Sequence, residues 1–374
     1  MVKEYEKAHP NVKVVLNQIE NNAYKTKIQV AMAGGSPPDI FFSWGYESLF
    51  KFVNARLVTD LTKSVGAQKS IYIPALLKGT TLKGKIYGLP LESGVGGVWY
   101  NKDLFAKYNL SEPKTWNEFI NVCDTLKKNG VSPLTGSMKD AWTGLQTYMY
   151  LVDRMGGENA FEKAAARKGH FSGEAFVKAN QVILDLVKKG YFNENALGVN
   201  WGEGQQLMAS GKTGMYVMGS WLYGILSDMQ PNTKWGFFPF PQIAGGKGNP
   251  SNLTGGLGAA FSVSAKCKNK KEAIALVKLL CSEKNEKEFF KMTNTLASTK
   301  TFMPENAPAT MKEVVGYMSK ANNMQMWHDQ VLPAPVASAE LEMLQQLFGG
   351  AVSAQEGAKK LEEVATQEMG PVKK

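Results

Sequence analysis

GLPLESGVGGVWYNKDLF, residues 88–105, is the stretch of sequence that decides the fold. An earlier stretch, GGSPPDIFFSWG at residues 34–45, has the same design. Each is interpreted as a strand that ends in a glycine-rich or polar loop carrying tryptophan or glutamate. Ligand sites in α/β proteins form where loops leave the ends of strands. The two stretches therefore predict a sheet that offers a ligand site at its strand ends.

Strand and helix patterns alternate in the first part of the chain. The alternation of apolar residues predicts a strand at 12–19, and helical spacing predicts a helix at 22–33 that stops at Gly34 and Gly35. A short apolar strand follows at 39–43, and helical spacing returns from residue 46 to 53. This βαβα order predicts parallel strands joined by helical crossovers, which is an α/β lobe.

A second lobe, richer in helix, is predicted from residue 104. Thr115 and Glu118 form a T-x-x-E capping box that opens a helix. The further predicted elements are a strand at 133–136, helices at 141–155 and 173–189, a strand at 213–218 and a helix from Trp221.

A return to the first lobe is predicted after a linker. The linker is the proline- and glycine-rich stretch 239–258. A strand at 260–263 and a helix at 271–280 follow it, and a third crossing is predicted near 299–304. The expected domains are discontinuous and joined by a hinge, namely 1–103 with 256–300 and 104–255 with 301–374.

Length and composition indicate an ordinary globular protein. A chain of 374 residues suggests about two domains. The formal net charge is +10, but lysine is spread along the chain and arginine occurs only at Arg56, Arg154 and Arg167. A nucleic-acid reader more often clusters these residues, so we interpret the charge as solvated surface, which would also suit a protein beside an anionic cell envelope.

Cysteine and targeting signals are sparse. Cys123, Cys267 and Cys281 have no C-x-x-C spacing. Cys123 and Cys281 fall on apolar faces of predicted helices and are interpreted as buried thiols. No apolar run reaches the roughly 18 residues of a membrane span, and no signal peptide is recognised in the sequence.

Enzyme motifs fail residue by residue. His9, His170 and His328 are far apart and lack metal-ligand spacing. A phosphate loop ending at Thr213 would need glycine where Gln206 stands, and no G-x-S-x-G is present. The remaining chemical feature is a set of carboxylates near tryptophans. A glycosidase would use two such acids at a defined separation. A sugar receptor would use the acids to bind hydroxyl groups and the indoles to cover the C–H patches of the sugar.

Candidate ligand residues follow from strand ends and glycines. Trp221 is the strongest, because it follows the strand at 213–218 at the start of a helix, and Trp44 follows a strand in the same way. Glu92 lies among glycines that let a ligand approach the backbone. Trp142 and Trp327 are candidates with core packing as the rival, and Trp116 and Trp235 are interpreted as core.

Acidic residues complete the candidate set. Asp329 is a weaker hydroxyl acceptor, and Asp140 is either an acceptor or, as the preferred interpretation, the N-cap of the helix after it. Trp201 and Glu203 stay undecided. With Gly256 added, the predicted ligand-binding set is Trp44, Glu92, Asp140, Trp142, Trp221, Gly256, Trp327 and Asp329, with no catalytic residue and no metal ligand.

Four motifs give the chain a family resemblance over almost its whole length. They are PPDIFFSW at 37–44, YGLPLE with VWYNKDLF at 87–105, GKTGMYVMGSW at 211–221 and GGLGAAFSVSA at 255–265. The chain resembles the extracellular solute-binding proteins of bacterial carbohydrate ABC transporters, the maltodextrin-receptor type of family 1. The resemblance implies a type II periplasmic-binding-protein-like α/β fold with two lobes, each a mostly parallel sheet flanked by helices, and a ligand cleft between them.

The resemblance also implies a function and a location. The expected protein is a monomeric receptor that captures a sugar or short oligosaccharide outside the membrane, as a lipoprotein or in the periplasm, and delivers it to an ABC permease by hinge closure. No catalysis, cofactor or nucleic acid is expected. The chain opens in a helical pattern ending at Pro10, so the first strand of the N-terminal lobe is expected to be missing.

Two alternatives stay open. One is a secreted glycoside hydrolase, which no marked pair of acids supports. The other is a receptor for an anion or polyamine. An anion receptor would aim arginine or a helix N-terminus at its ligand, and arginine is scarce here.

Overall fold

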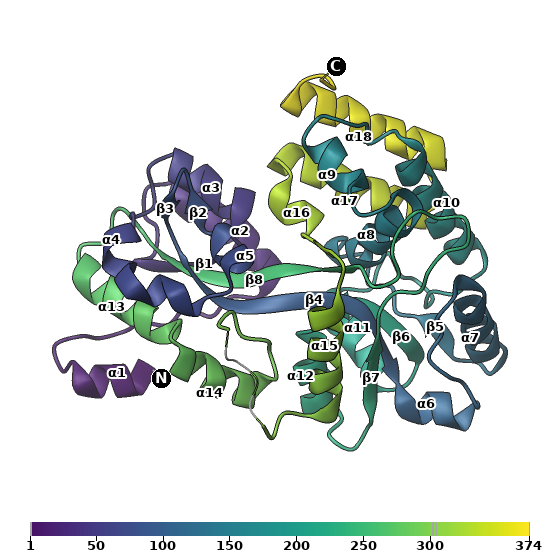
Figure 1. Cartoon of the computed structure of the whole chain (residues 1–374), viewed down its shortest axis with the longest axis horizontal. Coiled ribbons are helices and arrows are strands. Elements are labelled where there is room, and N and C mark those ends of the chain that lie inside the picture. The colour runs from purple at the N-terminus through teal and green to yellow at the C-terminus, as the bar shows by residue number, and fades with distance from the viewer. Residues whose placement is uncertain (1, 301–302, 304, 374) are drawn as a thin grey trace. The chain divides into compact units, whose positions relative to one another are not determined.

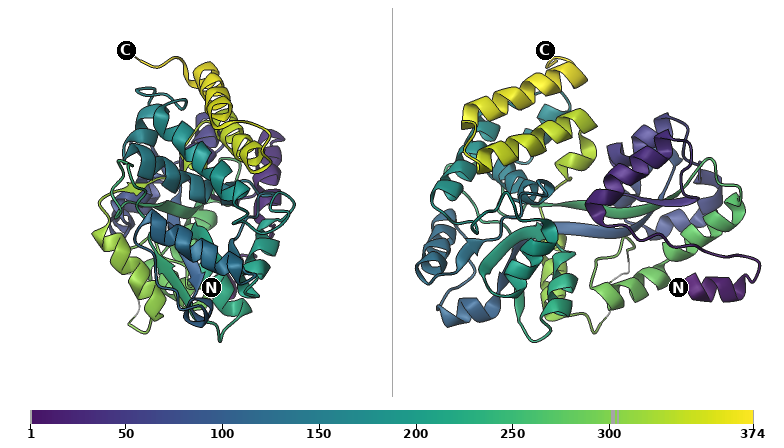
Figure 2. Two further views of the ribbon diagram at one scale, coloured as in Figure 1. Left: turned by 90° about the vertical axis from the view of Figure 1, so that its right-hand side faces the viewer. Right: turned by 180° about the vertical axis from the view of Figure 1, so that it is seen from behind.

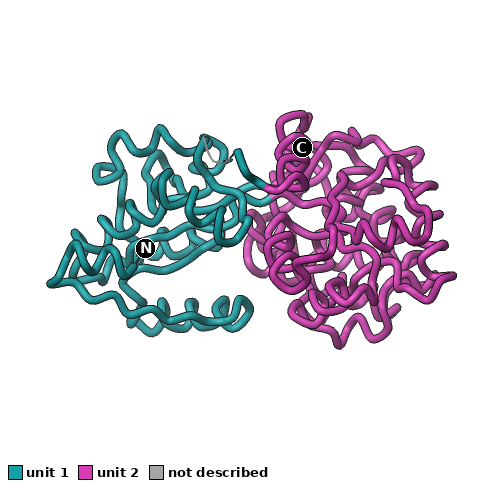
Figure 3. The backbone as a smooth tube through the Cα atoms, turned by 90° about the horizontal axis from the view of Figure 1, so that it is seen from below, with its two compact units in different colours: residues 1–94, 256–307 teal, residues 95–255, 308–374 magenta. Residues whose placement is uncertain are grey.

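The computed structural model describes residues 2–300, 303 and 305–373. The chain divides into two compact units (Figure 3). Unit 1 is Met1–Gly94 with Gly256–Ala307, and unit 2 is Val95–Gly255 with Pro308–Lys374. Residues 301, 302 and 304 of the third predicted crossing lie outside the described residues. The lobe boundaries expected at 103, 255 and 300 stay a prediction.

Unit 1 combines short strands with helices from both of its chain segments (Figure 1). The helix predicted at 22–33 is confirmed, and so are the strand at 39–43 and the helix at 271–280, to within one residue at each end. The elements are α1 (Val2–Ala8), α2 (Asn21–Ala33), β1 (Ile40–Ser43), α3 (Tyr46–Asn54), α4 (Thr62–Val65), η1 (Gly66–Ile71), α5 (Pro74–Lys78), β2 (Thr81–Leu82), β3 (Lys85–Ile86), α13 (Lys270–Leu280) and α14 (Glu283–Thr293).

Unit 2 is richer in helix, as predicted. Its capping box is confirmed, since the Thr115 side chain accepts from the Glu118 N–H while Glu118 reaches back to the cap. The elements are α6 (Lys102–Lys107), α7 (Trp116–Lys128), β5 (Ser132–Leu134), α8 (Trp142–Gly156), α9 (Ala160–Ala165), α10 (Glu174–Lys188), α11 (Trp201–Ala209), β6 (Thr213–Gly219), α12 (Leu222–Met229), β7 (Trp235–Phe238), α15 (Ala309–Lys320), β9 (Met324–Gln325), α16 (His328–Val331), α17 (Ala334–Phe348) and α18 (Ala354–Met369).

The core of unit 2 is built around α8. Every residue of this helix from Thr143 to Arg154 is buried, because α10 and α17 pack against it. The helices α17 and α18 lie side by side (Figures 1 and 2). Trp235 is 3% exposed, which confirms its core assignment. Cys123 and Cys281 are buried, as predicted, Cys267 is buried as well, and all three are free.

Two long strands, β4 (Leu89–Asn101) and β8 (Leu253–Val263), each run from one unit into the other. The strand order is β1-β8-β4-β6-β5, with β7 paired to β4 and β9 to β8. The expectation of mostly parallel sheets is wrong. β1 pairs antiparallel with β8, and β4 pairs antiparallel with β6 and β7, while β5–β6 and β8–β9 are parallel. The crossover argument concerns strands that follow each other along the chain, whereas β1 pairs with a strand from a distant segment.

Two further expectations are corrected. Residues 12–19 form no strand, and Val15 and Leu16 are 75% and 72% exposed. Alternation alone does not make a strand where no neighbouring strand binds its backbone. The linker expected at 239–258 contains the passage from unit 2 to unit 1, at residues 255 and 256, but it is not irregular throughout. β8 already begins at Leu253, and the buried Arg154 guanidinium donates to the carbonyls of Phe240, at 2.8 Å, and Asn252, at 3.0 Å.

Candidate functional site

Four tryptophans of unit 2 meet at the beginnings of helices. Trp142 and Trp201 are the first residues of α8 and α11, Trp221 is the N-cap of α12, and Trp327 precedes α16. The centroid of the Trp142 ring lies 5.2 Å from that of Trp201 and 6.4 Å from that of Trp221. Trp221 and Trp327 are 5.6 Å apart. We call Trp142, Trp201, Trp221 and Trp327 the tryptophan cluster.

Burial divides the cluster into two kinds of member. Trp327 is 2% exposed and belongs to the core of unit 2. Trp142, Trp201 and Trp221 are half-buried. Trp142, Trp201 and Trp221 therefore keep part of their surface accessible, and Trp327 packs against Trp221 from the core side. Ligand contact by Trp327 stays a prediction.

The position of Trp221 depends on a glycine two residues earlier. Its indole lies over Gly219, where an added Cβ would stand 2.2 Å from Cη2 and 2.3 Å from Cζ3 of the ring. No side chain larger than hydrogen fits beneath the indole in this arrangement. The G-S-W sequence, which begins with the last residue of β6, thus holds the Trp221 ring against the end of that strand.

Hydrogen bonds fix the helix starts around the cluster. The Asp140 carboxylate accepts from the backbone N–H of Trp201 at 2.7 Å. Its predicted role as N-cap of the helix after it is wrong, because the cap residue of α8 is Ala141. Asp140 instead binds the first turn of α11. Ser137 hydrogen-bonds Tyr216, whose ring centroid lies 5.8 Å from that of Trp201.

The chain around Trp327 is held by a buried polar group. His328 Nδ1 lies 2.9 Å from Glu340 Oε1, and its ring is stacked on Phe161 at 3.5 Å. This fixes the residue that follows Trp327. Asp329 is half-buried in the first turn of α16, and its role as hydroxyl acceptor stays a prediction.

Unit 1 holds the other three predicted ligand residues. Trp44 follows β1 and is half-buried, with its ring against Phe42 at 4.9 Å and Tyr24 at 6.0 Å, and with Lys25 Nζ 5.2 Å from the ring centroid. Gly256 has a φ of 144°, a conformation that favours glycine.

Glu92 lies inside β4, so the loop expected for it is a strand. Its backbone forms a bridge with Ala297, and its carboxyl approaches Gly258, where a Cβ would stand 3.1 Å from Oε1. Burial raises the pKa of Glu92 to about 7. Near neutral pH this carboxyl can both donate and accept hydrogen bonds.

The structure therefore brings together part of the predicted set. Trp142, Trp221 and Trp327 meet in unit 2 with Asp140 beside them, while Trp44, Glu92 and Gly256 belong to unit 1. The sequence does not decide the role of Trp201, yet Trp201 completes the cluster. A usable signal was the N-x-x-E capping box of Asn200 and Glu203, which places Trp201 first in a helix, as Trp221 is placed by its strand end.

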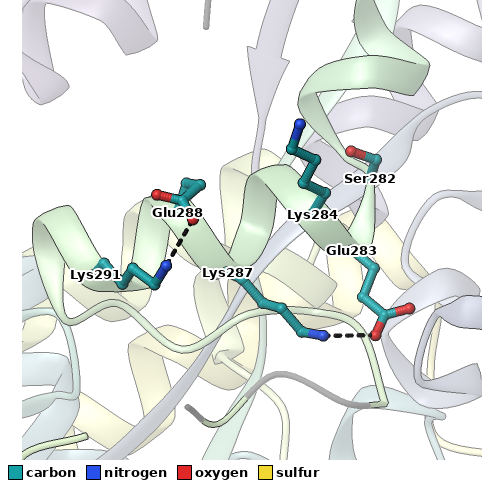
Figure 4. Close-up of a pocket in the computed structure, with 6 residues that line it drawn as sticks. All are labelled: Ser282, Glu283, Lys284, Lys287, Glu288 and Lys291. Carbon is teal, nitrogen blue, oxygen red and sulfur yellow. Dashed lines mark hydrogen bonds and ion pairs between the residues drawn. The ribbon is translucent and has the colours of Figure 1, made fainter. Parts of the chain in front are cut away.

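A hollow elsewhere is no part of this site. It is lined by residues of α14 and the residue before it, and none of them belongs to the predicted ligand set (Figure 4). Lys287 pairs with Glu283 at 3.0 Å and Lys291 with Glu288 at 2.7 Å. These are exposed ion pairs along one helix. Among the described residues, no group of His, Cys, Asp and Glu could hold a metal ion.

Comparison with known proteins assigns the chain to a family. The model of the bacterial extracellular solute-binding proteins matches residues 1–287. The chain belongs to this family. The family consists of binding proteins, and its members work outside the cytoplasm. Within the described part of this solute-binding protein, no helix is long and apolar enough to cross a membrane.

Several relatives of this solute-binding protein have known structures or names. A structure from a study of xylan utilization by Caldanaerobius polysaccharolyticus is 30% identical with a TM-score of 0.92, and the match covers 97% of this chain and 94% of that one. A chitin oligosaccharide binding protein is 26% identical with a TM-score of 0.89, over 98% and 93%. The multiple sugar-binding protein of Streptococcus mutans is 24% identical, over 80% of this chain and 71% of its own.

Proposed function

We propose that this solute-binding protein is an extracytoplasmic receptor that binds a sugar or short oligosaccharide and delivers it to an ABC permease. The tryptophan cluster carries the proposal. Indole faces cover the apolar C–H patches of a pyranose ring, and three half-buried indoles from three helix starts offer such faces. Polar groups beside the three indoles would form hydrogen bonds with the hydroxyl groups of the sugar.

The relatives support a saccharide over other solutes. The matched proteins include one from a study of xylan utilization, a chitin oligosaccharide binding protein and a multiple sugar-binding protein. An anion receptor that relied on arginine would have few available, because two of the three arginines are committed elsewhere. Arg154 binds backbone carbonyls, and Arg167 binds Glu362 at 2.8 Å.

The unit-1 residues are proposed to contribute hydrogen bonds and a second aromatic face. Glu92 is a hydroxyl partner, since a carboxyl with a pKa of about 7 serves as donor or acceptor. Trp44 is the aromatic face of this unit. Closure of the two lobes around the ligand, a monomeric state and a lipid anchor stay predictions of the family resemblance.

A ligand screen tests the proposal. Xylo-, chito-, malto- and manno-oligosaccharides are incubated with the full chain, and thermal unfolding, calorimetric titration and chromatography of the sugar follow. One class should stabilise the protein, by about 2.7 kcal/mol at 100 times its dissociation constant, and be recovered intact. Binding of no saccharide would contradict the receptor assignment, and shortened products would indicate a hydrolase.

A further inference from the structure

The net charge of this protein is carried almost entirely by one unit. Unit 1 has 21 Lys and Arg against 12 Asp and Glu, a net of +9, whereas unit 2 has 22 against 21, a net of +1. Charge that served only solubility would not need this division. The asymmetry indicates that unit 1 faces a negatively charged partner.

The densest lysines of unit 1 lie at the start of α13. Lys266, Lys268, Lys270 and Lys271 occupy four of six consecutive positions, and all four are exposed. Lys278 lies two turns after Lys271 on the side of α13 away from the buried Ala273, Leu276 and Val277. We call Lys266, Lys268, Lys270, Lys271 and Lys278 the lysine face.

Local structure does not explain these lysines. A helix N-terminus carries partial positive charge, so lysine at its first positions is unfavourable and an acid favourable. The first turn of α14 holds two acids, Glu283 and Glu286, and one lysine, whereas the first turn of α13 holds two lysines, Lys270 and Lys271, and one acid, Glu272. The arrangement works against the helix, which favours an external role.

The lysine face is not neutralised by its neighbours. None of its five lysines forms an ion pair with another described residue. Lys266 and Lys278 donate to the backbone carbonyls of Gly35 and Ser64, both at 2.8 Å. The nearby acids are Asp39, which is exposed and next to Cys267, and Glu272, whose carbonyl accepts from Tyr5 on α1. A positive excess remains on this surface.

We infer that the lysine face binds the surface of a membrane rich in anionic phospholipid headgroups. The lysine ammonium is a point charge, which suits attraction to a layer of mobile anionic headgroups. Binding of one phosphate by two parallel hydrogen bonds favours arginine instead. The inference rests on the proposed function for one step only, because delivery to a permease places the protein at a membrane. Unit 1 then contacts the bilayer, and unit 2, nearly neutral, does not.

Vesicle flotation tests the inference with the full chain. Vesicles of equal parts phosphatidylglycerol and phosphatidylcholine should carry the protein, and pure phosphatidylcholine should not. Salt at about 1 M, where the Debye length is about 3 Å, should release it. The triple variant Lys268→Gln, Lys270→Gln, Lys271→Gln should bind roughly 100-fold more weakly, because each lysine near an anionic surface strengthens binding about fivefold.

A matched variant distinguishes the effect of the lysine face on vesicle binding from the effect of net charge. Lys128→Gln, Lys359→Gln, Lys360→Gln removes the same charge from exposed positions of unit 2 and should bind the vesicles within about twofold of wild type. Equal loss in both variants, or no vesicle binding by wild type, overturns the inference. So does binding to inorganic polyphosphate without binding to vesicles. Saccharide titration should give wild-type affinity in both variants, so a failure of the inference is distinguishable from a failure of the receptor proposal.

Discussion

Gly219→Ala should weaken saccharide binding without unfolding the protein. The added Cβ would stand 2.2 Å from Cη2 of Trp221, whereas carbon atoms in contact keep about 3.5 Å, so the indole must move by about 1.3 Å. The strand itself tolerates alanine, because Gly219 is not among the glycines of positive φ. The substitution therefore acts on the ring and not on the backbone.

The size of the effect follows from the stacking energy at stake. Truncating a central aromatic of a binding site costs about 2 to 4 kcal/mol, and a gap of 0.5 to 1 Å forfeits about a quarter to a half of a dispersion contact. A displaced ring should thus lose about 1 to 2 kcal/mol of binding free energy, which is roughly 5- to 30-fold in affinity. Half-burial of the indole lets it swing toward solvent, so the melting temperature should change little.

The assay is calorimetric titration with the saccharide found in the screen, accompanied by tryptophan fluorescence and thermal melting. Gly316→Ala is the matched control, because a Cβ there meets nothing within 4 Å in the interior of α15. It should add about 1 kcal/mol of stability through helix propensity and leave binding unchanged. Wild-type affinity in folded Gly219→Ala, or equal weakening in the control, would refute the role given to the Trp221 ring.

Three further predictions concern the site and the two units. Trp221→Ala should cost about 2 to 4 kcal/mol of binding, roughly 30- to 1000-fold by calorimetry, while melting shows an intact fold; a mutant that only unfolds would remove Trp221 from the site. Burial raises the pKa of Glu92 from 4.5 to about 7. Between pH 4.5 and 7 the folded state therefore binds more protons at this carboxyl than the unfolded state does, so the free energy of unfolding falls as the pH rises through that range. In Glu92→Gln, the decrease in the free energy of unfolding between pH 4.5 and 7, measured by denaturant titration, should be smaller by about 1 to 3 kcal/mol. An unaltered pH profile would show that the Glu92 carboxyl is not the cause of the decrease. Ligand should lower the radius of gyration in small-angle scattering if the lobes close, and an unchanged radius at saturation would contradict the hinge.

Local signals in the sequence predicted the helices and strand ends well. The capping box at Thr115 and the strand before Trp221 are encoded within a few residues, and the structure has both. Pairing was the part that failed. Whether β1 meets a parallel or an antiparallel neighbour depends on β8, a strand from a distant segment, and no local pattern around residue 40 contains that information.

The candidate site shows the same limit. Trp142 and Trp221 are separate candidates in the sequence, and only Trp221 is argued from a strand end and a helix start. Their proximity depends on how the fold brings the starts of α8 and α12 together, which spacing along the chain does not measure. Glu92 was expected in a loop because of its glycines. In the strand those glycines instead make room for neighbours, since a Cβ on Gly96 would stand 2.2 Å from Thr254 Oγ1 and one on Gly97 2.2 Å from Phe237 Cζ.

The pairing of β1 with β8 constrains the order in which the protein can acquire its structure. During synthesis or export from the N-terminal end, residues 40–43 emerge long before residues 260–263, with which they hydrogen-bond. Most of unit 2, residues 95–255, is available before unit 1 can close its sheet. Contacts so distant in sequence carry a large loop-closure entropy and form slowly. A chain built this way stays incompletely folded until late, a property compatible with crossing a membrane unfolded and folding on the far side.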